Sequence, residues 1–306
     1  MRRNSAFVLG GEGADPNVAR VSIQTNIQSH LDSYPPSMRR VADAILSRPQ
    51  IVLELTISQL AQTCDTSETS VVRFCRTLGF TGYSPFKLQM AAELAAEVAH
   101  GGGEGPYGSD ILPTDTLAEM VAKVSASERF GIQETAENLD LAALQQVIDG
   151  ILVAGRVVAF GVGASNASAQ DLAHKLARIG RVARSEYDAH DALVSSALLH
   201  PGDVAIGFSH SGRTREAIEL LKVARAAGAA TVAVTNVGGS PLTAHADVTL
   251  RTAVRETTFR SGAMASRIAQ LTLVDYIFVG VARADYDNSI RALRVTRESL
   301  NGLKDG

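Results

Sequence analysis

Apolar residues are spaced differently in the two parts of this 306-residue chain. From about residue 36 to residue 100 they recur at helical spacing, as Met38, Val41 and Ile45 do before Pro49 ends their helix. After residue 114, short and nearly continuous apolar runs alternate with helical segments. Apolar strands separated by helices are typical of a parallel sheet covered on both faces. The pattern therefore predicts an all-α N-terminal domain and an α/β C-terminal domain with a parallel sheet flanked by helices.

The same spacing predicts where the individual elements lie. The N-terminal helices are expected over about 36–48, from Thr56 or Ser58 to a turn at Asp65, over 68–78 and over about 85–100, with a short apolar segment at 51–55. The C-terminal strands are expected at 157–161, 182–185, 204–209, 231–235 and 248–251. Helices are expected between and around them, over about 115–138, 141–154, 166–179, 214–227 and 262–284.

A stretch rich in glycine and proline, GGGEGPYGSDILP at residues 101–113, separates the two patterns. Its five glycines and two prolines among thirteen residues are typical of a linker. The predicted boundaries are a mobile tail at 1–29, a helical domain at 30–100, the linker at 101–114, the α/β domain at 115–290 and a C-terminal tail at 291–306.

Charge and composition narrow the class of protein. The net charge of −3 argues against a surface covered in basic patches, so contact with nucleic acid must be local. Residues 36–90 carry six Lys or Arg against four Asp or Glu, a balance that permits DNA binding without requiring it. No apolar run reaches the roughly 18 residues of a membrane span, and the N-terminal run is shorter than a signal peptide's core. We therefore expect a cytoplasmic protein without a membrane partner.

Residues 58–78, SQLAQTCDTSETSVVRFCRTL, predict a helix-turn-helix. Ser67 is a natural N-cap for the second helix, and Gly79 is placed to end it. In this motif the second helix presents its N-terminal turn to base edges, while hydroxyls and amides hold phosphates. The alternative is a small helical bundle that only dimerises. The predicted DNA contacts are Glu68 and Thr69 to bases, Ser67, Ser70 and Arg76 to phosphates, Arg73 to either, and Tyr83 and Lys87 to the backbone just beyond.

Two loops that follow predicted strands both open a helix. The first, GVGASNASA at 161–169, has Gly161 and Gly163 for a tight turn and Ser165 at the start of the helix. The second, SHSGRT at 209–214, has its hydroxyls around a glycine. Hydroxyls and free amides at the positive end of a helix suit a dianionic phosphate monoester. The hydroxyls of the second loop belong to Ser209, Ser211 and Thr214.

A dinucleotide-binding loop is the main competitor for the first segment. That fingerprint needs a third small residue where Asn166 stands and an acid near the end of the next strand, for which Glu186 is available. The second loop decides between the two, because a dinucleotide fold needs no cradle of hydroxyls there. The sequence therefore favours a phosphate-ester pocket.

Taken together, these segments resemble the RpiR family of transcriptional regulators, in which a helix-turn-helix precedes a sugar isomerase (SIS) domain. The resemblance covers about residues 30–290 and is carried by residues 67–87, 161–180, 208–221 and 260–275. It implies that the last of these segments packs subunits together in a homodimer or homotetramer. It also implies a phosphosugar ligand, with Gly163, Ser165, Ser209, Ser211 and Thr214 at its phosphate.

Catalysis has to be weighed because SIS domains also occur in isomerases. Glu256 resembles the catalytic glutamate of SIS isomerases, and in a sensor it would accept hydrogen bonds from sugar hydroxyls instead. His210 lies within the phosphate loop, and Lys304 is the only lysine after Tyr286. We therefore expect no catalytic residue. Cys64 and Cys75 lack a nearby histidine pair, so no metal and no cofactor is expected.

The combination of a DNA reader and a phosphate-ester pocket predicts a regulator that binds double-stranded operator DNA and responds to a phosphorylated sugar or sugar acid. One alternative is a phosphosugar isomerase or lyase whose N-terminal helices only dimerise. Another is a regulatory module that acts on a sugar kinase rather than on DNA.

Overall fold

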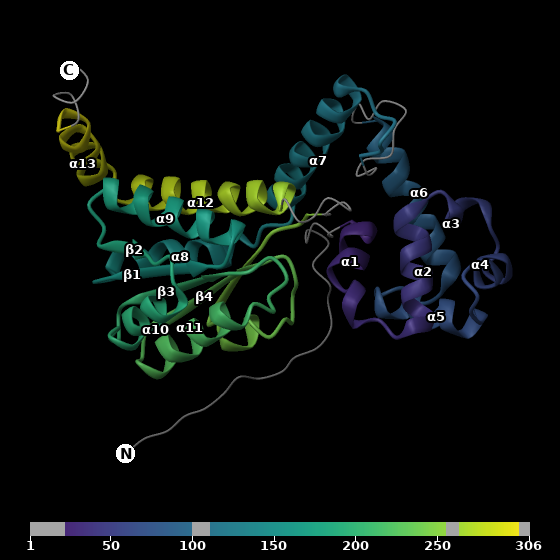
Figure 1. Cartoon of the computed structure of the whole chain (residues 1–306), viewed down its shortest axis with the longest axis horizontal. Helices are drawn as coiled ribbons and strands as arrows, with labels where there is room; N and C mark the ends of the chain where they lie inside the picture. The colour runs from purple at the N-terminus through teal and green to yellow at the C-terminus, as the bar shows by residue number, and fades with distance from the viewer. Residues whose placement is uncertain (1–21, 100–110, 255–262, 300–306) are drawn as a thin grey trace.

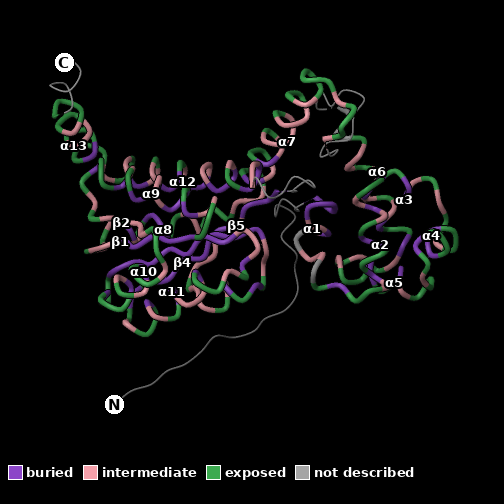
Figure 2. Tube along the Cα trace, viewed as in Figure 1, coloured by how far each residue is buried: buried purple, intermediate pink, exposed green. Residues whose placement is uncertain are grey.

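The computed structural model describes residues 22–99, 111–254 and 263–299, which form a helical domain followed by an α/β domain (Figure 1). This arrangement confirms the predicted fold class. Figure 2 shows that buried residues gather along the strands and on the inward faces of the helices in both parts.

Aromatic residues dominate the core of the helical domain. The ring of Phe74 meets the rings of Tyr34 and Phe86 edge to face, at centroid distances of 5.4 and 6.2 Å. Each such pair contributes about 0.5–1.5 kcal/mol beyond the burial of its area. The elements around this core are α1 (Ile23–Ser29), η1 (Leu31–Ser33), α2 (Pro36–Ser47), α3 (Ile51–Glu54), α4 (Ile57–Thr63), α5 (Glu68–Thr77) and α6 (Tyr83–Ala99).

Helix α1 differs from the prediction, which placed residues 22–29 in a mobile tail. Ser22 caps the helix by accepting a hydrogen bond from Thr25 N, and Ile23 and Ile27 are buried in the core of the domain. A seven-residue helix with two apolar anchors is too short to give a helical period in the sequence. The ordered domain therefore begins earlier than predicted.

The α/β domain is built on a parallel sheet, which in the described residues has the strand order β2-β1-β3-β4-β5. The strands are β1 (Val157–Gly161), β2 (Ala183–Ser185), β3 (Val204–Phe208), β4 (Ala230–Thr235) and β5 (Val248–Arg251). Gly161 pairs with Phe208, so β1 and β3 end side by side. The loops that follow these two strands are therefore neighbours at the carboxyl edge of the sheet.

Alternation along the strands divides the core into two layers. Val232 and Val234 face the helices on one side of the sheet, whereas Ala233 faces those on the other side. The first side is covered by α8 (Leu141–Val153), α9 (Ala164–Arg178) and α12 (Met264–Ala284), with α7 (Leu117–Glu137) against α12. The second side is covered by α10 (Ala189–Ala197) and α11 (Arg215–Ala226), as Figure 1 shows.

The C-terminal end is more helical than predicted. Helix α13 (Tyr286–Glu298) includes residues 291–298, which the sequence pattern assigns to a C-terminal tail. The pattern misses this helix because Asp, Arg and Glu side chains between its apolar residues obscure the helical period. Helix α12 is long and apolar enough to pass for a membrane span by length and composition. Its residues Leu273, Val274 and Ile277 are fully buried against the sheet, as expected for the core helix of a folded domain.

Candidate functional site

Polar groups fix the start of α4, the start of α5 and the turn between the two helices. Thr56 and Gln59 form a capping box at the start of α4, and Ser67 caps α5 by accepting from Ser70 N. Asp65 takes a left-handed conformation at φ 47°, which short polar side chains tolerate. Arg40 on α2 donates to the carbonyl oxygens of Cys64 and Asp65. Sequence reasoning missed this last contact, because the arginine lies on a helix outside the motif.

Helix α5 buries one face and exposes the other. Val71, Phe74 and Cys75 are inside, whereas Arg73 and Arg76 are exposed and form no ion pair within the described parts of the chain. Four more of the predicted DNA contacts lie at the start of the helix: Ser67, Glu68 and Thr69 are exposed and Ser70 is partly exposed. Glu68 accepts a hydrogen bond from Ser58 on α4. The exposed face therefore combines a polar N-terminal turn with two free guanidinium groups.

Tyr83 and Lys87 have roles inside the domain. The Tyr83 hydroxyl lies 3.1 Å from the carbonyl oxygens of both Val52 and Leu55, and the Tyr83 side chain is buried. Lys87 Nζ donates to the same Leu55 oxygen at 3.1 Å. These contacts fasten α6 to α3. The Tyr83 hydroxyl thus faces the protein, whereas partly exposed Lys87 uses one of its three N–H donors in this contact. The predicted contacts of Tyr83 and Lys87 with the DNA backbone stay predictions.

The first predicted phosphate loop is closely packed. Gly163 has φ 61°, in the region that favours glycine, and α9 starts at the next residue. At Gly161 an added Cβ would lie 2.7 Å from the carbonyl carbon of Ser165, so the strand can pass under the helix only with glycine there. Gln270 on α12 donates from Nε2 to the Ser165 hydroxyl at 3.2 Å. The Ser165 hydroxyl is therefore held at the N-terminus of α9.

The second loop brings its hydroxyls together. Ser209 is almost fully buried, and its Oγ lies 2.8 Å from Thr214 Oγ1. Ser211 Oγ accepts from Arg213 N at 3.2 Å. Helix α11 begins right after Thr214, whose hydroxyl caps no backbone amide of the helix. The hydroxyls of this loop and that of Ser165 thus stand at two neighbouring helix N-termini, where the backbone carries partial positive charge.

Glu256 lies outside the described residues, which leaves its predicted contact with the ligand as an expectation. Within the described segments, His, Cys, Asp and Glu form no cluster of three that could hold a metal ion. Both cysteines are buried, and burial raises the pKa of Cys75 to about 12. A thiol with such a pKa is a poor nucleophile at neutral pH.

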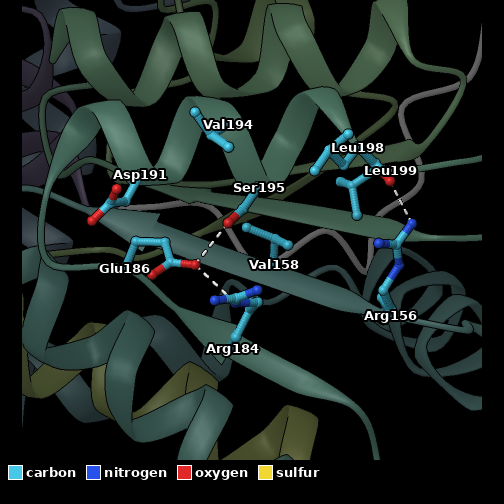
Figure 3. Close-up of a pocket in the computed structure, with 9 residues that line it drawn as sticks. All are labelled: Arg156, Val158, Arg184, Glu186, Asp191, Val194, Ser195, Leu198 and Leu199. Atoms are coloured by element: carbon cyan, nitrogen blue, oxygen red, sulfur yellow. Dashed lines mark hydrogen bonds and ion pairs between the residues drawn. The ribbon is translucent and has the colours of Figure 1, made fainter.

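A separate pocket of about 360 Å³ lies beside the edge strand β2 and helix α10 (Figure 3). Four of its polar side chains, those of Arg156, Arg184, Glu186 and Ser195, are already paired. Glu186 binds Arg184 at 2.8 Å and accepts from Ser195 at 2.7 Å, and Arg156 binds Asp203 and the Leu198 carbonyl. Glu186 is the acid that a bound dinucleotide would need, and its carboxylate is instead paired with Arg184 and Ser195. The phosphate loops remain the better candidate site.

Comparison with known proteins agrees with this division of the chain. Residues 21–97 match the model of the "Helix-turn-helix domain, rpiR family", and residues 150–280 match the SIS domain. An uncharacterized HTH-type transcriptional regulator of Caldanaerobacter subterraneus is 37% identical over 91% of this chain and 96% of its own length. The chain belongs to the RpiR family of transcriptional regulators. The RpiR match begins at residue 21, which agrees with the presence of α1.

Two further relatives add context for an RpiR-type chain. The Vibrio vulnificus NanR protein, solved in complex with ManNAc-6P, is 29% identical and covers 92% of this chain and 98% of its own, with a TM-score of 0.58. A bifunctional protein glk of Burkholderia thailandensis is 34% identical over 86% of this chain but only 40% of its own length. A sequence similar to most of this chain therefore also occurs as one part of a longer protein.

Proposed function

We propose that this RpiR-type protein binds operator DNA through α5 and releases or tightens that contact when a phosphorylated sugar or sugar acid binds its SIS domain. The observation that carries the proposal is the meeting of two hydroxyl-bearing loops at the carboxyl ends of β1 and β3, in a chain that also has a helix-turn-helix. The NanR structure supports it, because that relative was solved with a sugar phosphate.

The phosphate is held by hydroxyls and helix N-termini in this proposal. Ser165, Ser211 and Thr214 donate to the phosphate oxygens, and Ser209 orients Thr214 through the hydrogen bond between their hydroxyls. Gln270 donates to Ser165 Oγ, so that hydroxyl has its own proton left for the ligand. The dipoles of α9 and α11 add favourable interaction with a dianion. Glu256 is proposed to meet the sugar hydroxyls.

The DNA contact requires two copies of the chain. A single α5 reads one half-site, and a dimer places two such helices on a pseudo-palindromic operator. We propose that the SIS domains form the homodimer or homotetramer through α12 and α13. Val279, Tyr286, Ile290 and Val295 are exposed apolar residues on these helices, and a second copy would cover them. Such a regulator acts in the cytoplasm.

The test is a mobility shift on DNA from around the protein's own gene, repeated with a panel of sugar phosphates. Wild-type protein is expected to shift one fragment, and one sugar phosphate is expected to change that shift. The double variant Ser209→Ala/Ser211→Ala is expected to bind the fragment with unchanged affinity and to lose the response. A response that survives in the double variant would exclude these loops as the sensor.

The enzyme alternative is tested with the same samples. We propose that the chain is not an isomerase. Two relatives that align with it over 96% of their own length are named as transcriptional regulators. Turnover of a sugar phosphate, followed by ³¹P NMR, together with no shift on any fragment would reverse that assignment.

A further inference from the structure

The last residue of β5, Arg251, is a cation that has no role in the phosphate site proposed above. Arg251 is largely buried, its Nε is buried without a hydrogen-bond partner, and its guanidinium forms no ion pair in the part of the chain that the structure describes. Burial lowers the pKa of this group. An unpaired buried cation is costly, so such groups are rare unless a partner anion arrives.

The strand register places Arg251 in line with the phosphate loop. Arg251 pairs with Thr235 on β4, and Ser209 N donates to the carbonyl oxygen of Val234, which continues the ladder to β3. Ser209, Thr235 and Arg251 are therefore neighbours across three adjacent strands. At the usual spacing of about 4.8 Å between strands, the Cα atoms of Ser209 and Arg251 lie about 10 Å apart.

The three side chains also share one side of the sheet. Ser209, Thr235 and Arg251 form a row across the three strands. The residues just before them, Phe208, Val234 and Leu250, belong to the core layer of α8, α9 and α12. Successive side chains alternate between the two faces, so Ser209, Thr235 and Arg251 all face away from that layer. Thr235 Oγ1 bonds the carbonyl oxygen of His210, which ties the middle of the row to the phosphate loop.

The loop after β4 touches both the guanidinium and the phosphate loop. An added Cβ on Gly238 would lie 3.3 Å from Arg251 Cζ, so the loop backbone passes directly beside the cation. Two residues later, Ser240 Oγ lies 2.0 Å from where a Cβ of Gly212 would stand. The cation and the hydroxyl cradle are thus held at the two ends of one short loop.

We propose that Arg251 recognises a second acidic group on the effector, so that the regulator prefers a phosphorylated sugar acid to the corresponding neutral sugar phosphate. This inference rests on the proposed phosphosugar site. With the phosphate in the cradle, an extended five- or six-carbon chain spans the row toward Arg251. A guanidinium binds a carboxylate through two parallel hydrogen bonds, which selects a planar acid over a neutral hydroxyl or aldehyde.

The test compares ligands that differ only in oxidation at C1. Isothermal titration would measure binding of glucose 6-phosphate against 6-phosphogluconate, and of ribose 5-phosphate against 5-phosphoribonate. In at least one pair, wild-type protein is expected to bind the acid about tenfold more tightly, the scale of one charge-assisted contact. Arg251→Met is expected to bring that ratio close to one, mainly by weakening the acid, and Arg251→Lys to keep part of it.

Two controls separate this idea from its alternatives. Arg225→Gln removes an exposed arginine that already pairs with Asp247, and it should leave the preference intact. Arg251→Met should melt at the same temperature as wild type or higher, because it removes an unpaired cation while keeping most of the volume. A Met variant that binds neither ligand but melts normally would also count against a purely acid-specific role.

The possible failures point to different conclusions. If no sugar phosphate binds, or if Ser209→Ala/Ser211→Ala binds all four ligands as wild type does, the proposed function itself fails. If glucose 6-phosphate or ribose 5-phosphate binds through these serines but neither acid binds more tightly, only the role of Arg251 is wrong. Tighter binding of fructose 1,6-bisphosphate than of either acid would likewise reject a carboxylate partner.

Discussion

At the scale of single residues, Gly212 is required by two independent features of the phosphate loop. Its φ of 63° lies in the region that favours glycine, and a Cβ there would collide with Ser240 Oγ. Gly212→Ala should therefore displace the loop, lower the free energy of unfolding by about 1–3 kcal/mol and weaken phosphate-ester binding. Thermal melts with and without glucose 6-phosphate would measure both effects.

Gly82 offers a matched control for that substitution. It has no positive φ, and an added Cβ would meet nothing within 4 Å. Gly82→Ala should leave ligand binding unchanged and stability within about 0.5 kcal/mol. Equal losses in the two variants would show that Gly212 has no special role.

A substitution of Arg73 tests whether α5 contacts DNA or only packs within the helical domain. Its side chain is exposed on the face opposite Val71 and Phe74, so truncation removes no packing. Arg73→Ala should weaken operator binding by about 1–3 kcal/mol if the guanidinium reads a base, and lower specificity at that position. Fluorescence anisotropy with operator and scrambled DNA would distinguish a base contact from a phosphate contact, since the latter weakens both equally.

The control for Arg73 is Arg225→Ala, which removes an exposed arginine from α11, outside the proposed subunit interface. It should leave the operator affinity as it is. If both variants bind the operator equally more weakly than wild type, the loss comes from the change in net charge and not from a contact between Arg73 and the DNA.

At the scale of elements, Asp203 joins the starts of β1 and β3. Its carboxylate is almost fully buried and accepts from His200 N, from Arg156 N and from the Arg156 guanidinium. Burial acts to raise its pKa, but these hydrogen bonds outweigh burial and the pKa is lowered. A carboxylate with a lowered pKa stabilises the fold above its unfolded-state pKa, and that contribution is lost as the pH falls through the folded-state value.

Asp203→Asn should therefore cost stability at neutral pH, by about 1.5–3 kcal/mol as judged from hydrogen bonds to charged groups. The difference from wild type should begin to shrink below the ordinary Asp pKa of about 4 and vanish as the pH falls through the lower folded-state pKa, where the wild-type carboxylate is also protonated. Urea unfolding at pH 7 and at acid pH would test this. Asp149→Asn, an exposed change on α8, should show no such dependence.

The elements differ in how well the sequence predicts them. Strands β1, β3 and β4 were placed to within a residue, because each is a buried apolar run that ends at a polar or glycine-rich loop. Helices α1 and α13 were missed, since short length in one and charged residues in the other hide the helical period. The hydroxyls of Ser209 and Thr214 are predictable because both residues lie in one short segment, residues 209–214, between a strand and a helix.

Side chains that act across long sequence distances were not predictable in the same way. Gln270 meets Ser165 from 105 residues away, and Tyr83 is turned inward by carbonyl groups of α3. The position of Arg251 in line with Ser209 follows only from the strand order β3-β4-β5. Local composition cannot reveal such pairs, because tertiary packing alone brings them together.

At the scale of the whole molecule, hydrogen bonds run from the phosphate loop to the first helix of the DNA-binding domain. Asn236 N donates to the His210 carbonyl oxygen, and the Asn236 side chain binds both backbone groups of Val254. The next residue back, Ala253, donates to Thr135 on α7 at 3.0 Å. Beside Thr135, Glu134 accepts from Ser22 N at 3.2 Å, at the N-terminus of α1.

This arrangement predicts that Glu134 couples effector binding to DNA binding. Its carboxylate meets the positive end of α1, so replacing it with a neutral amide weakens the link without touching either site. Glu134→Gln should bind both the effector and the operator separately about as wild type does, while the effector changes operator affinity several-fold less. Coupling free energies of about 1–3 kcal/mol are usual for such regulators, which leaves ample room to measure the loss.

Glu137→Gln on the same helix is the control, since Glu137 bonds only the exposed Gln133 among the contacts described for it. Coupling is reciprocal, so operator DNA must change effector affinity by the same factor that effector changes operator affinity. Measuring both directions in each variant shows whether the two binding steps still share one equilibrium. An unchanged factor in Glu134→Gln would exclude the contact between Glu134 and α1 as the route of the coupling.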